Sequence, residues 1–321
     1  MGKPIVAKDH IRLAMIGWVD GNGHPYSWSA IFNGYDPEAM RRNCPYPGIP
    51  AYLDKEPKDT LRIQGANVTH IWTDDPEEAP KICEASLIPN AVTRPEDVIG
   101  HVDAVIIATD KGHEHVERAR PFVEAGLPVF IDKPMVDNEA DLVVFSEWVK
   151  QGKAILSSSC MRYGKEFIPY QLSVNNLGQL RYAGITMAKS WERYGIHAME
   201  SVYPIVGPGF VSVRNTGTSE RNVVHMKHSG GFDVVAVVTK DLFGGFGLLQ
   251  LVGTADYAFV PFRDTFYSFK MQLTSFIEYL RTGERPFPFE DTVELMKIII
   301  AGIRSREQQG RKVYLSEIAP H

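Results

Sequence analysis

The sequence predicts an α/β fold in which an N-terminal Rossmann-like, doubly wound parallel sheet is followed by a C-terminal α+β domain with a mainly antiparallel sheet. Two patterns carry this prediction. Up to residue 160, short apolar runs alternate with segments of helical periodicity, the order of a parallel sheet covered by helices. After about Tyr163 the segments become β-branched and glycine-rich, with the spacing of antiparallel strands. A length of 321 residues suits two domains, expected at 1–160 and 161–321.

The strands of the first domain are predicted from short apolar runs, of which 102–109 is apolar on both faces, as buried parallel strands are. Each run precedes a helical segment, and glycine ends two of these helices, at Gly126 and Gly152. The predicted strands are 12–17, 68–73, 102–109, 128–131 and 153–157. The predicted helices are 27–33, a segment opening at the acidic run 74–78, 113–125 and 138–150.

One stretch of the first domain, residues 35–57, interrupts this alternation. It contains Cys-Pro-Tyr-Pro-Gly-Ile-Pro at 44–50, which we interpret as too rich in proline for a helix or a central strand. We therefore expect an irregular insertion. Loops of that length usually serve function or pack against a partner.

The second domain is predicted to combine a sheet with three helices. The expected strands are 180–189, 209–216, 223–227, 232–239 and 243–252. The expected helices are 198–206, 264–282 and 290–308. The last is amphipathic through apolar residues such as Leu295, Ile298 and Ile299, and we expect it to pack near the junction of the two domains.

The composition excludes several classes of protein. A net charge of −5 without a basic run argues against binding to nucleic acid or anionic membranes. No apolar stretch is long enough for a membrane span. Three scattered cysteines indicate neither disulfides nor a zinc site, so we expect no metal and a cytoplasmic location. The partners expected are small molecules and further protein chains.

The first strand-turn-helix is a candidate phosphate-binding turn. Gly17, Gly21 and Gly23 would let the protein backbone approach the pyrophosphate of a dinucleotide, and a helix N-terminus would supply N–H groups. The spacing departs from GxGxxG, so an ordinary glycine-rich turn without a ligand is an equally good interpretation of these residues. His24 is expected either to cover the cofactor, to touch the substrate or to form an oligomer contact.

The end of the second strand offers an acid for a ribose. Asp74 could bind the ribose hydroxyls and so favour NAD over NADP. The alternative is that Asp74 and Asp75 only cap the helix that follows. Both readings stay open, and the cofactor is expected to be NAD or NADP.

Several motifs in order along the chain resemble those of the Gfo/Idh/MocA family of NAD(P)-dependent oxidoreductases. They are Ala108-Thr109 with His115 downstream, Asp132-Lys133-Pro134 for the family's Glu-Lys-Pro, Arg162-Tyr163, the segment 195–200 with His197 and Glu200 for Gly-x-His-x-x-Asp, and 290–313 for the last helix and strand. The resemblance covers nearly the whole chain.

The resemblance implies hydride transfer between a nicotinamide and the carbinol carbon of a sugar, nucleotide sugar or cyclitol. His197 is the expected base and Lys133 the expected cation beside the reacting oxygen, roles that suit their chemistry. The resemblance also implies a cis peptide before Pro134. It places the cofactor against Thr109, Asp110, His115, Asp132, Lys133 and Pro134, together with the glycine turn, His24 and Asp74.

The sequence departs from the family four residues before His197. The aspartate of the family's dehydrogenases is replaced there by Arg193. Because arginine binds carboxylates and phosphates bidentately, Arg193 predicts an acidic group on the substrate. The expected substrate-binding residues are Arg162, Tyr163, Trp191, Arg193, Tyr194, His197 and Glu200, with the aromatic residues either stacking on a sugar ring or belonging to the core.

Two other functions remain open at this point. A redox-neutral enzyme, such as a lyase, epimerase or glycosidase, would keep NAD bound and use transient oxidation. A ligand-sensing or scaffold protein would keep the fold without turnover. In either case, the resemblance implies a homodimer or homotetramer formed through the C-terminal sheet.

Overall fold

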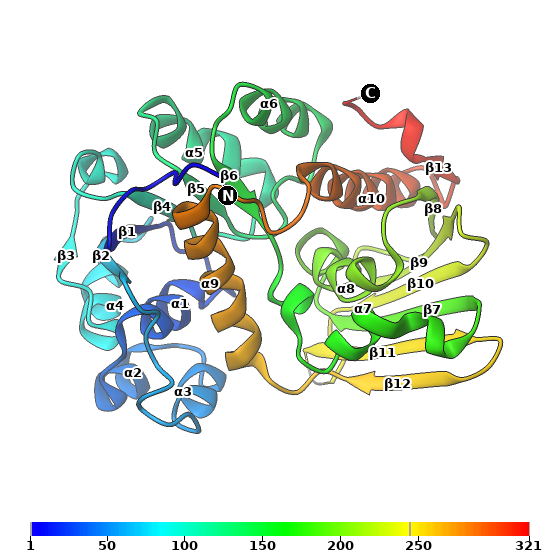
Figure 1. The fold of residues 1–321 in the computed structure, drawn as a ribbon, viewed down its shortest axis with the longest axis horizontal. Coiled ribbons are helices and arrows are strands. Elements are labelled where there is room, and N and C mark those ends of the chain that lie inside the picture. Colours follow the sequence, from blue (N-terminus) through cyan, green and yellow to red (C-terminus); the bar gives the residue numbers. More distant parts are fainter. Residues whose placement is uncertain (1, 244, 321) are drawn as a thin grey trace.

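The first sheet of the computed structural model, which describes residues 2–243 and 245–320, is parallel and six-stranded (Figure 1). Its strands lie in the order β3-β2-β1-β4-β5-β6. They are β1 (Ile11–Ile16), β2 (Ala66–Trp72), β3 (Asn90–Ala91), β4 (Ala104–Ile107), β5 (Val129–Ile131) and β6 (Ile155–Ser157). This is the doubly wound order in which the strand sequence reverses beside β1, so the predicted Rossmann-like sheet is confirmed.

The helices of the first domain follow the predicted alternation. They are α1 (His24–Asn33), α4 (Glu78–Ser86), α5 (His115–Glu124) and α6 (Glu139–Lys150). Asn138 caps α6 by accepting the Asp141 N–H. The acidic run 74–78 forms a turn, and α4 begins only at its last residue, because Asp75 accepts backbone N–H groups ahead of the helix.

The expectation of an irregular insertion at 35–57 is wrong. The segment forms two short helices, α2 (Pro37–Asn43) and α3 (Gly48–Leu53). Pro37 stands in the first turn of α2 and Pro50 in that of α3, where the missing N–H breaks no helical hydrogen bond. Asp36 caps α2 by accepting the N–H groups of Glu38 and Ala39. Proline therefore starts these helices and does not exclude them.

The second sheet has seven strands in the order β12-β11-β7-β10-β9-β8-β13. They are β7 (Leu180–Ala188), β8 (Phe210–Asn215), β9 (Arg221–His228), β10 (Asp233–Thr239), β11 (Phe246–Gly253), β12 (Tyr257–Pro261) and β13 (Val313–Tyr314). All pairs are antiparallel except β10 with β7, whose connection passes through α8 and two strands. The mainly antiparallel sheet is thus confirmed.

The remaining helices join the two sheets. They are α7 (Ile168–Ser173), α8 (Trp191–Val206), α9 (Thr265–Thr282) and α10 (Phe289–Glu307), with 3-10 turns at 95–98, 112–114, 160–163, 174–177 and 315–317. Helix α8 starts seven residues before its predicted start at Ala198. Helix α10 contacts α6 on one side and α8 on the other. Helix α9 packs against α1 and α3 (Figure 1). The carbonyl of Leu280 accepts the N–H groups of Ile5 and Val6. Helices of the second half of the chain therefore pack against the first half and stabilise it.

None of the helices within 2–243 and 245–320 is long and apolar enough to cross a membrane.

Candidate active site

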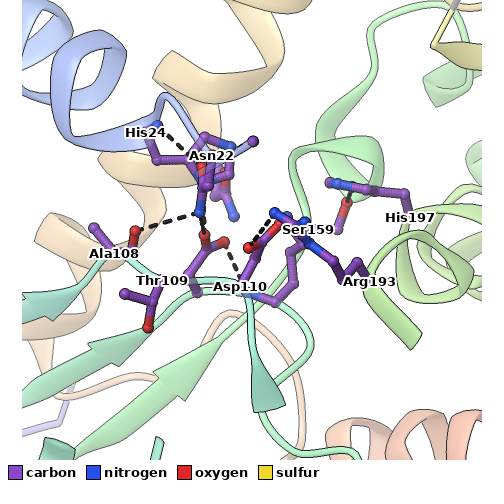
Figure 2. Close-up of polar contacts among 12 residues, drawn as sticks. Asn22, His24, Ala108, Thr109, Asp110, Ser159, Arg193 and His197 are labelled. Carbon is purple, nitrogen blue, oxygen red and sulfur yellow. Dashed lines mark hydrogen bonds and ion pairs between the residues drawn. The ribbon is translucent and has the colours of Figure 1, made fainter. Parts of the chain in front are cut away.

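The carboxyl ends of β1, β4 and β5 meet the first turns of α8, where the two halves of the chain face each other (Figure 2). Ligands of doubly wound sheets bind at this edge, at the point where the strand order reverses. In Figure 2, Asn22 and His24 lie on one side of Asp110, and Arg193, Ser159 and His197 lie on the other.

A buried group of charges forms the centre of this edge. Lys133 follows β5, is 2% exposed, and lies with its Nζ 3.5 Å from Oδ2 of Asp110. Arg193, from α8, donates to both oxygens of Asp110 at 2.9 and 2.7 Å. Burial alone disfavours both charges. The carboxylates of Asp132 and Asp110 nevertheless raise the pKa of Lys133, and the two cations lower the pKa of Asp110 to about 2. Lys133 is therefore held as a cation.

Arg193 consequently faces a protein carboxylate, whereas the sequence predicted an acidic ligand group. Its Nη2 also donates to the backbone oxygen of Asp20 at 3.3 Å. Asp110, expected at the cofactor, is instead the partner of Arg193 and joins the two domains. Arg193 replaces the family's aspartate four residues before His197. Its charge is thus neutralised by Asp110, which follows β4 and lies close to Arg193 only in the folded chain.

A second acidic group, Asp132, holds residues of the glycine turn. Asp132 is fully buried; its Oδ2 accepts from Nδ2 of Asn22 at 2.9 Å and lies 2.6 Å from Nδ1 of His24. Its Oδ1 accepts the backbone N–H of Lys133 at 2.7 Å. Because a carboxylate can only accept, His24 carries its proton on Nδ1. Asp132 therefore fixes both the tautomer and the direction of the His24 ring.

His197 lies in α8 and is enclosed. Its Nδ1 lies 2.6 Å from Oγ of Ser159, and its ring contacts Tyr194 and Phe246 edge-on. Burial lowers the pKa of His197 well below its ordinary value, and Lys133 and His24 lower it further. It is therefore neutral at physiological pH and able to accept a proton. The two acids of α8 pair elsewhere, Glu192 with Arg306 and Glu200 with Arg162.

The insertion folds over the glycine turn. Tyr46, between α2 and α3, accepts the Gly21 N–H at 2.7 Å, and a side chain at Gly23 would overlap Tyr46 and Ile49. From the second domain, Nζ of Lys189 donates to the Gly21 carbonyl at 3.1 Å. Gly23 therefore serves the packing of the insertion, and the Gly21 N–H already has a partner.

The ribose-binding acid also has partners within the chain. Asp74 accepts the Trp18 N–H at 3.0 Å and forms an ion pair with Arg118 at 2.7 Å. It does not cap α4, which begins four residues later. Asp74 thus lies beside the turn after β1, where a ribose acid belongs, but with a guanidinium next to it.

Two features of this edge fit a dinucleotide. Gly17 has a φ of +93°, and a Cβ there would lie 2.6 Å from Cγ2 of Thr109, so only glycine lets the β1 turn approach β4 so closely. The Oγ1 of Thr109 is buried and lacks a hydrogen-bond partner in the described chain. Together with Asp74, these residues fit a dinucleotide, whereas the Gly21 N–H, a candidate donor to its phosphates, already donates to Tyr46.

A pocket of about 350 Å³ opens between the glycine turn, the insertion and the second domain. Its wall includes His24, Ser27, Tyr52, Lys189 and Tyr194. Of the predicted substrate-binding residues, only Tyr194 lines it. Sites for small ligands have volumes of about 300 Å³ upward, so the pocket can hold one sugar-sized molecule.

Several predicted site residues lie elsewhere. Trp191 is fully buried, and its Nε1 donates to the Ile299 carbonyl at 3.0 Å, so it belongs to the core and forms no stacking wall. Arg162 is paired with Glu200, and Tyr163 donates to Ser275 at 3.1 Å. These three residues position α8 and α9 around the site without lining the pocket.

His115 and Pro134 shape the loops of the site. The ring nitrogens of buried His115 lie 2.9 Å from the carbonyl oxygens of Met135 and Thr109, so His115 ties the loop after β4 to the loop after β5. The bond between Lys133 and Pro134 is cis, as the resemblance implies.

The comparisons with known proteins agree with this architecture. Residues 49–159 match the Gfo/Idh/MocA model, described as an oxidoreductase family with an NAD-binding Rossmann fold. The resemblance to the Gfo/Idh/MocA family is confirmed. The description of this family supports the predicted NAD(P)-dependent oxidoreductase class and dinucleotide cofactor. No curated protein matches the sequence.

Solved structures of dehydrogenases share the fold over almost their whole length. A probable dehydrogenase from Thermotoga maritima is 18% identical, with a TM-score of 0.74 over 96% of this chain and 100% of that one. A myo-inositol 2-dehydrogenase from Lactobacillus plantarum is 15% identical, with a TM-score of 0.74 over 95% and 99%. A scyllo-inositol dehydrogenase from Lactobacillus casei, solved with NAD(H) and scyllo-inositol, is 13% identical, with a TM-score of 0.75 over 96% and 99%.

Sequence reasoning missed most of the pocket wall. Tyr46 and Tyr52 come from the insertion, and Phe246 and Phe269 from β11 and α9. Lys189 was also missed. Its position in the sequence could have indicated it, because it directly precedes the segment that contains Arg193 and His197. The aromatic residues have none, because nothing in a strand or helix pattern shows which apolar residues face a ligand.

Proposed function

We propose that this chain is an NAD-dependent oxidoreductase that transfers a hydride between the nicotinamide and a carbinol carbon of a sugar-like or cyclitol substrate. The observation that carries the proposal is Lys133, a buried lysine kept charged by Asp110 and Asp132 at the strand end where the cofactor of this family belongs. A cation in a site with so little solvent is costly unless carboxylates pair with it, as Asp110 and Asp132 do here, and a charge fixed in this way can stabilise negative charge that develops on a substrate oxygen.

In this proposal residues 1–160 bind the dinucleotide and residues 161–321 contribute to substrate binding. Gly17, Asp74 and Thr109 would hold the cofactor. When bound, the nicotinamide accepts or supplies the hydride. Lys133 stabilises negative charge on the substrate oxygen, and a neutral histidine accepts its proton. The resemblance assigns that role to His197, and the pocket geometry described below assigns it to a second histidine.

The substrate favoured by the geometry is a neutral polyhydroxylated ring. Arg193 is already paired with Asp110, so an acidic group would have to displace a buried carboxylate to reach it. The fold neighbours that act on myo-inositol and scyllo-inositol support the same class.

Lys133→Met tests the proposal, because methionine keeps much of the volume and removes the charge. We expect NAD⁺ to bind the purified wild-type protein, and reduced nicotinamide absorbance to appear with a member of a panel of myo-inositol, scyllo-inositol, glucose and glucuronate. Lys133→Met should lower the rate by about a thousandfold, the size of losses seen when one charge-stabilising group is removed. The exposed Lys312→Met is the matched control and should keep full activity.

The other results have definite meanings. Retained turnover in Lys133→Met refutes the role of Lys133. Turnover of a panel compound without net nicotinamide reduction indicates a redox-neutral enzyme. Dinucleotide binding without any turnover indicates a sensor or scaffold.

We also propose that the chain forms a homodimer or homotetramer through the open face of its second sheet. Apolar side chains are exposed there on several strands: Val211, Val223, Val252, Tyr257 and Phe259. Large exposed apolar areas on a sheet usually mark an interface. Tyr257→Glu should therefore shift the mass measured by light scattering toward the monomer, and an unchanged mass would exclude this face.

A further inference from the structure

His24 and Asp132 form a hydrogen-bonded pair that the resemblance does not assign. Asp132 lies 2.6 Å from Nδ1 of His24, and Asn22 donates to the same carboxylate oxygen at 2.9 Å. The His24 ring is stacked on Trp28 at 4.1 Å between ring centres and meets Phe269 edge-on at 5.2 Å. The ring is therefore held on three sides, by one carboxylate and two aromatic rings.

The remaining ring nitrogen of His24 is available to a ligand. Nε2 forms no hydrogen bond within the described chain, and His24 lines the 350 Å³ pocket. Because Nδ1 carries the proton that faces Asp132, Nε2 carries the lone pair. His197, by contrast, does not line this pocket. A ligand in the pocket therefore meets the imidazole of His24.

The wall around His24 is suited to hydroxyl groups. Oγ of Ser27 and the hydroxyl of Tyr52 are buried in the wall of the pocket. They lie near each other, but neither forms a hydrogen bond of acceptable geometry within the described chain. Lys189 adds an ammonium group, and Phe246 and Phe269 add apolar faces. Unsatisfied buried hydroxyls beside aromatic rings match a ring with several hydroxyls and C–H faces.

We propose that His24, held by Asp132, is a further catalytic residue whose Nε2 accepts the proton of a substrate hydroxyl bound in this pocket. The inference rests on the proposed function. In the oxidation, the O–H bond breaks and its proton passes to Nε2 of His24, while the C–H bond breaks and its electron pair passes as hydride to the nicotinamide of NAD⁺. The carbinol becomes a carbonyl, and Asp132 remains a carboxylate that stabilises the imidazolium.

The charges around His24 suit a proton acceptor. Burial lowers its pKa, and Lys133 adds to that effect, whereas Asp132 and Asp110 act in the opposite direction. His197 also interacts electrostatically with His24, and Lys189 lines the same pocket. The net effect is a neutral imidazole at physiological pH. Oxidation should then fall at acid pH, with a midpoint below the ordinary histidine pKa of 6.5, because protonated His24 cannot accept.

The test compares histidine variants by binding and by pH profile, with NAD⁺ and myo-inositol or scyllo-inositol as probes. His24→Asn should lower kcat/KM by about a hundredfold or more and remove the acid limb of its pH profile, while the Kd for NAD⁺ stays within about twofold. His197→Asn should lower the rate but keep the acid limb. The matched control is His113→Asn, which removes an exposed His–Asp pair of 2.9 Å outside the pocket and should change neither quantity.

A measurement on the unsubstituted protein accompanies these variants. In protein labelled with ¹⁵N-histidine, the His24 ring should be neutral with the proton on Nδ1, and either polyol, added with NAD⁺, should shift the Nε2 signal. An acid limb that survives in His24→Asn overturns the proposal. A raised Kd for NAD⁺ with unchanged kcat also overturns it and makes His24 a cofactor-binding residue.

The two proposals fail in different ways. If wild-type protein binds NAD⁺ but oxidises neither polyol, the oxidoreductase proposal fails for this substrate class. The ¹⁵N signal then decides the role of His24: a polyol-induced shift of Nε2 supports the hydroxyl contact, and its absence overturns it.

Discussion

Arg193→Met provides the sharpest test of the charge arrangement at the domain junction. Methionine keeps most of the side-chain volume but leaves Asp110, which is 1% exposed, with Lys133 as its remaining cation. The pKa of Asp110 is about 2, against an ordinary 3.8. At about 1.4 kcal/mol per pKa unit, the surroundings of the ionised carboxylate contribute about 2.5 kcal/mol to stability near neutral pH.

Because Lys133 supplies part of this stabilisation and remains in the variant, we expect Arg193→Met to lower the free energy of unfolding by about 1–2 kcal/mol. Larger losses of about 3–5 kcal/mol follow when fully buried pairs are broken, but Arg193 is 29% exposed and partly hydrated. The assay is urea unfolding followed by tryptophan fluorescence. The double variant Asp110→Asn/Arg193→Met removes both charges and should recover most of the loss, because no uncompensated carboxylate remains.

The same variant has a defined pH dependence. Since the folded-state pKa of Asp110 is depressed, its contribution is fully present above the ordinary pKa of 3.8 and is lost as the pH falls through about 2. The difference between wild type and Arg193→Met should therefore shrink over that interval. A variant within about 0.5 kcal/mol of wild type at neutral pH would refute the reasoning. If it kept its stability but lost affinity for glucuronate, Arg193 would serve an acidic ligand, as the sequence predicted.

Three further predictions follow from single contacts. Tyr46→Phe frees the Gly21 N–H for a phosphate oxygen, so the Kd for NAD⁺ measured by calorimetry should fall about fivefold, the effect of one hydrogen bond of about 1 kcal/mol; an unchanged Kd would show that no phosphate reaches Gly21. Asp74→Ser leaves Arg118 paired only with Glu114 and removes the acid beside the glycine turn, so the ratio of NAD to NADP affinity should shift about tenfold toward NADP; a shift the other way would contradict this interpretation. Trp191→Phe should cost about 2 kcal/mol in urea unfolding and leave KM unchanged, whereas a raised KM at full stability would return Trp191 to the substrate.

The insertion shows why local rules failed where they did. Its prolines predict that no helix forms, which is correct for proline inside a helix but not for proline at its start. The sequence contained the correcting signal, since Asp36 before Pro37 is a cap followed by a first-turn proline. The packing of Tyr46 onto Gly21, by contrast, had no local signal.

The sequence by itself determined the architecture of this protein, because hydrophobic periodicity is a local property. Strand-helix alternation predicted the parallel sheet, the change of texture after Tyr163 predicted the second sheet, and ordered motifs indicated the family and the positions of Lys133 and His197.

Only the tertiary structure decided which charges neutralise each other. Arg193 and Asp110 are 83 positions apart, and His24 and Asp132 are 108 apart. Each pair forms because β4, β5 and the glycine turn end at one edge of the sheet and α8 is packed against that edge. A residue's charge can be read from a sequence, but its partner is set by distance in space, and electrostatic energy depends on that distance and on burial.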